Sequence, residues 1–314
     1  MKKCFFSPFA ASLVFGFFLV FTVCCSNCTS PPPSEEPEQL YYKENAWGRV
    51  YYDQFASAPF PHPERQDGYS YQGTFYPYNP HYSNSAVGVF VPKGFQPGRK
   101  IDLVYYFHGN FETIASAPAK FELYRQFAES GVNALLILPE TAFNAPDNFG
   151  GKLEEPGGFQ RLVEEVTAYI NGSGIGADSR PGSIVLTGHS GAHRVMAKIL
   201  ELGEFPWKIR EVILFDALFA EVEAFAAWAG LLKSRLAVVY TKNGRTADNT
   251  ARLVELRSRK LVRAKQVDGF TGAESDSLQR KILVAASPYD HYGVQYKADQ
   301  FRKLLASSRV LDKG

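Results

Sequence analysis

The chain has 314 residues, 45% of them hydrophobic and 14% aromatic, which is enough apolar material for one large core or two smaller ones. This composition excludes a chain that is disordered throughout. The net charge is +2 and no run of five or six like charges occurs, so nothing points to nucleic acid or an acidic polymer as the main partner.

The first 28 residues differ in composition from the rest. Met1-Lys-Lys3 is a short positive start, and the stretch from Phe5 to Val23 carries no charge and is rich in Phe, Leu and Val. This pattern is typical of a secretion signal. The apolar run is also close to the roughly 20 residues that span a bilayer, so an uncleaved membrane anchor is an alternative.

All four cysteines lie in this segment, at positions 4, 24, 25 and 28. The stretch Val20-Phe-Thr-Val-Cys24 loosely resembles a lipoprotein attachment site, although the small residues that usually precede the cysteine are missing. Lipid anchor, cleaved signal and transmembrane anchor therefore all remain open. Each predicts an exported protein, either periplasmic, an outer-membrane lipoprotein or at the cell surface. The remainder has no cysteine, which excludes disulfides, a thiol nucleophile and cysteine-based metal sites there.

Residues 29–40 are rich in Pro, Glu and Ser and predict an extended linker, and residues 41–311 are expected to form a single domain. The first part of that domain, up to Ser85, is crowded with Tyr, Phe, Pro and Asn. Edge strands and hairpins that cover a core are the first interpretation, and exposed rings that stack on a sugar are the second. His62 and His81 lie in loops of this part and are expected to be solvated.

Several later segments are apolar on both faces, which is the pattern of strands inside a parallel sheet covered by helices. The predicted strands are Ser85–Pro92, Asp102–Phe107, Ala134–Leu138, Ser183–Thr187, Val212–Phe215, Leu236–Tyr240 and Ile282–Ala286.

Helical periodicity separates these strands. The residues that share a helical face are Leu162, Val166, Tyr169 and Ile170; Val195, Ile199 and Leu202; and Phe301, Leu304 and Leu305, while Leu253, Leu256 and Lys260 mark a weaker face. Strands that alternate with helices predict an α/β fold with a doubly wound, mostly parallel sheet.

Ligands of an open parallel sheet bind beyond the carboxyl ends of its strands. Polar residues occur there after four predicted strands: His108-Gly-Asn110, Gly188-His-Ser-Gly-Ala192, Asp216 and Asp290-His291. A serine becomes nucleophilic when an imidazole takes its proton, and a carboxylate orients that imidazole. Ser190, His291 and Asp216 are the candidates for these three roles.

Residues 85–307 resemble the α/β-hydrolase family, in which the three groups follow in the order Ser, Asp, His. Gly188-His-Ser-Gly-Ala192 looks like its nucleophile elbow, with Ala192 in place of the second glycine. The resemblance implies an oxyanion hole formed by the N–H groups of Gly191 and Asn110, with Phe111 beside them. In most of the family the acid follows the next strand along, which makes Asp248 the alternative to Asp216.

The spacing of His189 and His193 suggests a shared metal, but no glutamate of the zinc-protease pattern and no third ligand is evident. We therefore expect neither a metal nor a cofactor. His108 is expected to organise its loop by hydrogen bonding.

The resulting prediction is an exported serine hydrolase that cleaves an ester or amide in a small-molecule or cell-envelope substrate through an acyl-serine intermediate. The alternative is a non-catalytic, surface-tethered protein on a hydrolase scaffold that binds carbohydrate or peptide with the Tyr-rich residues 69–82. A metal hydrolase that uses His189 and His193 is a third possibility.

Overall fold

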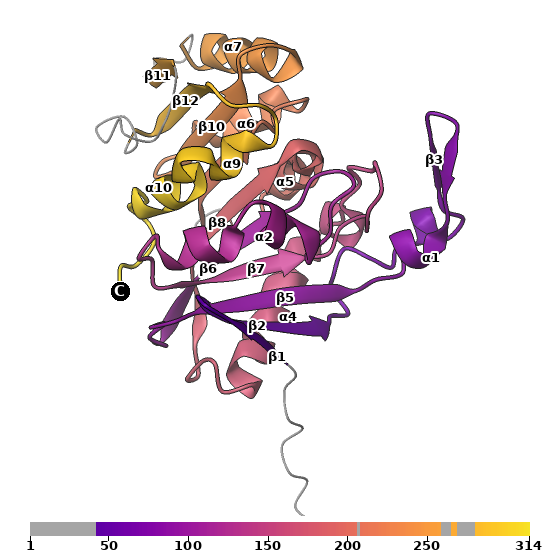
Figure 1. Ribbon diagram of the computed structural model, residues 1–314, viewed down its shortest axis with the longest axis vertical. Coiled ribbons are helices and arrows are strands. Elements are labelled where there is room, and N and C mark those ends of the chain that lie inside the picture. Colours follow the sequence, from indigo (N-terminus) through magenta and orange to yellow (C-terminus); the bar gives the residue numbers. More distant parts are fainter. Residues whose placement is uncertain (1–41, 206–207, 259–264, 269–279) are drawn as a thin grey trace, which may run out of the picture. The chain divides into compact units, whose positions relative to one another are not determined.

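A computed structural model describes residues 42–205, 208–258, 265–268 and 280–314 of the chain. Its main feature is one large, mostly parallel sheet (Figure 1). In spatial order the strands are β1 (Tyr42–Asn45), β2 (Gly48–Gln54), β5 (Ala86–Pro92), β7 (Ala134–Pro139), β6 (Lys100–Phe107), β8 (Arg180–His189), β9 (Ile209–Phe215), β10 (Arg235–Thr241), β12 (Ile282–Ser287) and β11 (Lys265–Asp268).

The pairing changes once across the sheet, from antiparallel to parallel. The pairs β1–β2, β2–β5 and β5–β7 are antiparallel, and every later pair from β7 to β11 is parallel. All seven predicted strands are present. Their alternate residues enter two separate cores, as Leu103 and Tyr105 enter one and Val104 and Tyr106 the other. This accounts for strands that are apolar on both faces.

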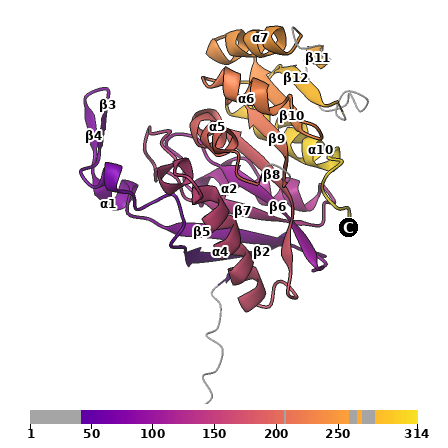
Figure 2. The same ribbon diagram turned by 180° about the vertical axis from the view of Figure 1, so that it is seen from behind.

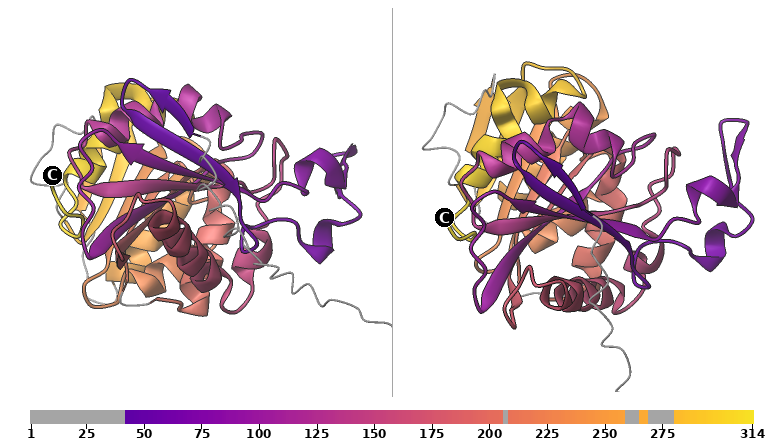
Figure 3. Two further views of the ribbon diagram at one scale, coloured as in Figure 1. Left: turned by 90° about the horizontal axis from the view of Figure 1, so that it is seen from below. Right: turned by 60° about the horizontal axis from the view of Figure 1, so that its bottom comes forward.

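Helices cover both faces of the sheet, so the predicted doubly wound α/β fold is confirmed (Figures 2 and 3). One face is covered by α4 (Gly158–Gly172), α5 (His193–Leu202), α6 (Val222–Trp228) and α7 (Arg245–Ser258). The other is covered by α2 (Ser116–Lys120), α3 (Leu123–Ala128), α9 (Gly293–Tyr296) and α10 (Gln300–Ala306). No helix within the described ranges combines the length and the apolar character needed to cross a bilayer.

A small hairpin lies outside the main sheet and projects from it (Figure 1). It consists of β3 (Tyr69–Tyr71) and β4 (Thr74–Tyr76) and is followed by α1 (Tyr78–His81). The short 3-10 helices are η1 (Pro63–Arg65), η2 (Gly151–Glu154), η3 (Ser190–Ala192) and η4 (Lys297–Asp299).

Some predictions differ from the structure or lie outside it. The predicted N-terminal signal or anchor at residues 1–28, the linker at residues 29–40 and Lys260 fall outside the described residues. His62 is buried and its Nε2 lies 3.0 Å from Glu155 Oε1, so its predicted exposure is wrong. Leu202 is 36% exposed because it ends α5 and turns away from the core.

Candidate active site

Ser190 stands at a sharp turn between a strand and a helix. Strand β8 ends at His189, and Ser190 then takes a left-handed backbone with φ of 52° before the chain enters η3 and α5. Such a conformation is strained for any residue with a side chain and is often found at functional sites. Gly188 is required by space, because a Cβ there would lie 2.5 Å from the Cβ of Ala192. The local geometry is that of a nucleophile elbow.

A chain of hydrogen bonds connects Ser190 to two residues that are distant in the sequence. The Oγ of Ser190 lies 2.9 Å from Nε2 of His291, and Nδ1 of His291 lies 2.6 Å from Oδ2 of Asp216. Ser190 follows β8, His291 follows β12 and Asp216 follows β9. The carboxyl edge of the sheet therefore brings the three residues together. The Asp216 side chain is 3% exposed, whereas a third of the His291 side chain reaches solvent.

Asp216 is held as a carboxylate by several donors besides His291. Its oxygens accept hydrogen bonds from the N–H and hydroxyl of Thr241 and, at 2.5 Å, from the hydroxyl of Thr246. Burial opposes ionisation, but the bonds from His291 and both threonines outweigh it and lower the pKa of Asp216. Asp248, the alternative acid, lies in the first turn of α7.

The predicted oxyanion residues lie beside the elbow. A Cβ on Gly109 would be 3.0 Å from the Cβ of Ser190, so the loop after β6 passes directly over the serine. The side-chain oxygen of Asn110 is 2.3 Å from where a Cβ of Gly191 would stand. Phe111 donates its N–H to the carbonyl of Ala145 at 3.2 Å, and that donor is therefore already engaged. Asn110 therefore stays the candidate oxyanion donor of this loop.

Asn148 is a site residue that sequence reasoning missed. Its Oδ1 also lies 2.3 Å from the position of a Gly191 Cβ, and this oxygen is buried without a hydrogen-bond partner. Its Nδ2 lies 3.3 Å from Nε2 of His193. Two asparagine side chains from different loops therefore meet over Gly191. A single asparagine in the long loop after β7 offers no periodic signal that could have identified it.

His189 contacts His291, the candidate base, through its ring and through a hydrogen bond. Its Nε2 donates to the carbonyl oxygen of His291 at 2.8 Å, and the centroids of the two rings lie 4.5 Å apart. Its Nδ1 faces Oε1 of Glu112 at 3.6 Å, which is ion-pair range rather than a hydrogen bond.

Glu112 joins three parts of the site. Its carboxylate accepts the N–H of Gly109 at 2.9 Å and the ammonium of Lys120 at 3.2 Å, and it faces His189. Burial opposes its ionisation, but His189, Gly109 and Lys120 together lower the pKa of Glu112 to about 2. One buried carboxylate therefore contacts both the loop after β6 and the ring of His189, which packs against His291. Sequence reasoning missed it because the loop path is not encoded in any periodicity.

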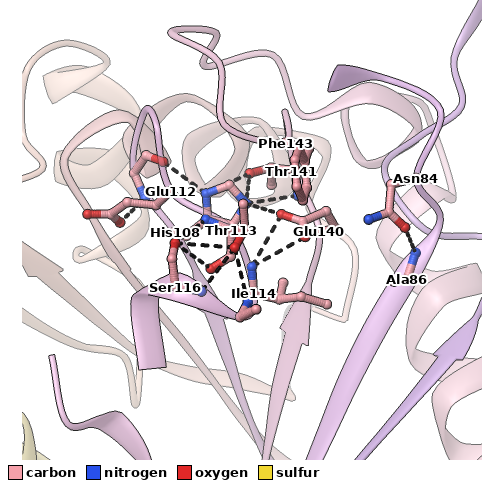
Figure 4. Close-up of polar contacts among 12 residues, drawn as sticks. Asn84, Ala86, His108, Glu112, Thr113, Ile114, Ser116, Glu140, Thr141 and Phe143 are labelled. Atoms are coloured by element: carbon pink, nitrogen blue, oxygen red, sulfur yellow. Dashed lines mark hydrogen bonds and ion pairs between the residues drawn. The ribbon is translucent and has the colours of Figure 1, made fainter. Parts of the chain in front are cut away.

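A second buried acid fixes the start of the same loop (Figure 4). The Nε2 of His108 lies 2.8 Å from Oε1 of Glu140 and also 2.8 Å from the hydroxyl oxygen of Thr141. The carboxylate of Glu140 also accepts the N–H of Ile114. Burial disfavours the imidazolium, but Glu140 raises the pKa of His108 above its ordinary value. His108 thus organises the loop.

His189 and His193 do not share a site. His189 contacts His291, whereas Nδ1 of His193 is hydrogen-bonded to the carboxylate of Glu221. No cluster of three or more His, Cys, Asp or Glu side chains suited to a metal occurs in the part of the chain that the structure describes.

The sheet and the elbow together define an α/β-hydrolase fold, and solved structures support this. An S-formylglutathione hydrolase from Agrobacterium tumefaciens superposes with a TM-score of 0.50 at 15% identity, over 86% of this chain and 98% of that one. A mutant feruloyl esterase module from Clostridium thermocellum, in complex with sinapinate, gives 0.52 at 10% identity, over 89% and 97%. No protein-family model and no curated protein matches the sequence.

Proposed function

We propose that the protein is a serine hydrolase that cleaves a carboxylic ester through an acyl-serine intermediate. One observation carries the proposal: the continuous hydrogen-bonded chain from Ser190 through His291 to Asp216, built on a strained elbow. A serine alone in a tight turn would need neither partner. The same edge of the sheet is where open α/β folds bind their ligands.

In the proposed acylation step, the hydroxyl oxygen of Ser190 attacks the ester carbonyl while Nε2 of His291 takes its proton. Asp216 holds Nδ1–H of His291 and stabilises the imidazolium. The negative oxygen of the tetrahedral intermediate accepts hydrogen bonds from the N–H groups of Gly191 and Asn110. The imidazolium then gives its proton to the departing alcohol as the carbon–oxygen bond breaks.

Deacylation repeats these steps with water in place of the serine. His291 takes a proton from the water, the resulting hydroxide attacks the acyl carbon, and Ser190 leaves with the proton. Preference for an ester over an amide is supported by the feruloyl esterase among the similar solved structures.

Labelling with a fluorophosphonate tests the proposal. The probe should attach to Ser190 in the wild-type protein, and peptide mapping should locate it there. Ser190→Ala should remove the labelling and lower the turnover of p-nitrophenyl acetate by about a millionfold, because the triad acts as a unit. Wild-type protein that neither labels nor hydrolyses the ester would instead favour the non-catalytic binding protein on a hydrolase scaffold.

We also propose that the enzyme is exported, on the pattern of residues 1–28 alone. The mass of the mature N-terminus distinguishes a lipidated Cys24, a cleaved signal and a retained anchor. A cytosolic protein with an unprocessed and soluble N-terminus would contradict export.

A further inference from the structure

The hairpin β3–β4 presents aromatic side chains to solvent, and its Tyr76 lies close to Phe111 in the loop after β6. Tyr71 is 38% exposed, Phe75 is 58% exposed, and Phe111, in the loop after β6, is 56% exposed. Large exposed rings that lie close together mark interaction sites more often than isolated ones do. The hairpin is therefore a candidate binding surface.

The strand register sorts these rings onto two faces. Tyr69 pairs with Tyr76, and Tyr71 pairs with Thr74, so these four side chains share one face of the hairpin. Phe75 lies on the opposite face, where its ring meets the position of a Cβ on Gly68. On the first face Tyr71 is exposed, whereas Tyr76 is half-buried against a small core cluster and lies close to Phe111.

The contact between Tyr76 and Phe111 lies next to the candidate oxyanion donor Asn110. The ring centroid of Tyr76 lies 6.4 Å from that of Phe111, and Phe111 directly follows Asn110. Phe111 has a left-handed backbone with φ of 59°, which is uncommon for a bulky residue. We define Tyr71, Tyr76 and Phe111 as the aromatic platform.

The hairpin is built as a rigid support. Gln72 and Gly73 both have positive φ, 49° and 80°, as a two-residue hairpin turn requires. At its base, Arg65 is bonded to Asp147 at 2.6 Å and lies 4.9 Å from the ring of Tyr69.

A pair of hydrogen bonds fixes the chain that follows the hairpin on its C-terminal side. Nδ1 of His81 donates to the carbonyl of Phe143 at 2.7 Å, and the N–H of Phe143 donates back to the carbonyl of His81. The predicted solvation of His81 is therefore only partly right. Rings held in place lose little conformational entropy when a ligand binds.

The chemistry of the platform selects the kind of ligand. From Gly68 to Pro92 the chain contains no Asp, Glu, Lys or Arg, and its polar groups are hydroxyls and amides such as Ser70, Gln72 and Thr74. The Arg65 guanidinium beside Tyr69 is paired with Asp147, so this surface offers little attraction for anionic lipid, nucleic acid or charged peptides. A sugar ring has C–H groups on its faces and hydroxyls at its rim, and it fits an aromatic face bordered by hydroxyls and amides.

We propose that the aromatic platform binds the neutral polysaccharide part of an acylated glycan and directs its ester to Ser190. The proposal rests on the proposed esterase function, and it adds the substrate class. The sugar chain lies along Tyr71 and Tyr76, and the ester-bearing unit reaches Phe111 next to Asn110.

Affinity electrophoresis tests binding without hydrolysis. Ser190→Ala protein is run in native gels that contain xylan, β-glucan or mannan, with gelatin as the peptide control. At least one polysaccharide should retard it. Adding Tyr71→Ala should weaken this binding about tenfold, whereas Tyr71→Phe, which keeps the ring, and Phe75→Ala, on the opposite face, should keep it.

Hydrolysis supplies the second readout. The ratio of kcat/KM on acetylated xylan to kcat/KM on p-nitrophenyl acetate should fall about tenfold in Tyr71→Ala and stay unchanged in Phe75→Ala. The platform is overturned if no polysaccharide retards the protein or if only gelatin does. It is also overturned if Tyr71→Ala binds polysaccharide as well as its parent, or if Tyr71→Ala and Phe75→Ala lose binding equally. Polysaccharide binding without any ester hydrolysis would instead reject the esterase function and keep the platform.

Discussion

At the residue scale, three residues of the proposed site have a strained backbone. Ser190, Phe111 and Asp216 all have positive φ, at 52°, 59° and 42°. Each such residue costs on the order of 1–3 kcal/mol, and the surrounding contacts must compensate for it. Around Asp216 these contacts are the bonds from Thr241, Thr246 and His291. Aspartate and asparagine tolerate this conformation better than most residues, which permits a clean test of the carboxylate.

Asp216→Asn should lower kcat about ten-thousandfold, the scale observed when the acid of a triad becomes an amide. The amide keeps the shape and the backbone but no longer favours Nδ1–H on His291. Steady-state hydrolysis of p-nitrophenyl acetate measures the loss, and thermal unfolding checks the fold. Asp248→Asn is the matched control and should retain wild-type kcat. If the two variants exchanged these outcomes, Asp248 would be the acid.

At the scale of elements, the elbow depends on how closely β8 approaches η3 and α5. A Cβ on Gly188 would meet the Cβ of Ala192 at 2.5 Å, the sulfur of Met196 at 2.9 Å and the carbonyl of Phe107 at 3.0 Å. Two of these atoms belong to backbone or to a Cβ, so they cannot move without shifting the elements that carry them. The elbow thus tolerates alanine at position 192 only because position 188 is glycine.

Gly188→Ala should therefore lower the free energy of unfolding by roughly 1–3 kcal/mol, the usual cost of overpacking, and should displace Ser190 enough to reduce kcat. Gly172→Ala serves as the control. Gly172 ends α4 without a positive φ, and a Cβ there would have no neighbouring atom within 4 Å, so alanine should stabilise the protein by about 0.4–1 kcal/mol. Chemical denaturation measures both changes, and equal stability of the two variants would refute the steric account.

The elements that could be predicted from the sequence are the strands that are buried on both faces. Strands such as β6 and β10 are buried on both faces, and this leaves a continuous apolar run in the sequence. Strand β1 is largely exposed and β2 is only half buried, so the first interpretation of residues 41–85 as edge strands and hairpins could give no boundaries. Ser190, Asp216 and His291 were predictable because each follows a strand end, whereas Glu112 and Asn148 sit in loops whose course depends on tertiary contacts.

At the scale of the whole described unit, the site joins segments that are far apart in the chain. Glu112 contacts Gly109 in the loop after β6 and His189 at the elbow. His189 in turn donates to the carbonyl oxygen of His291, which follows β12. The ionised form of this one carboxylate therefore stabilises contacts among three loops. Its effect on global stability should depend on pH.

The direction of this dependence follows from the lowered pKa of Glu112, about 2 against an ordinary 4.5. A depressed pKa gives stability that is complete above the unfolded value and is lost as the pH falls through the folded one. Wild-type protein should exceed Glu112→Gln in free energy of unfolding by about 3 kcal/mol at pH 7, and the difference should shrink between pH 4.5 and pH 2. Denaturant titrations at several pH values measure it, and Glu64→Gln, at an exposed carboxylate, should keep the wild-type profile. A difference that stayed constant down to about pH 2 would mean that Glu112 acts through its shape and not through its charge.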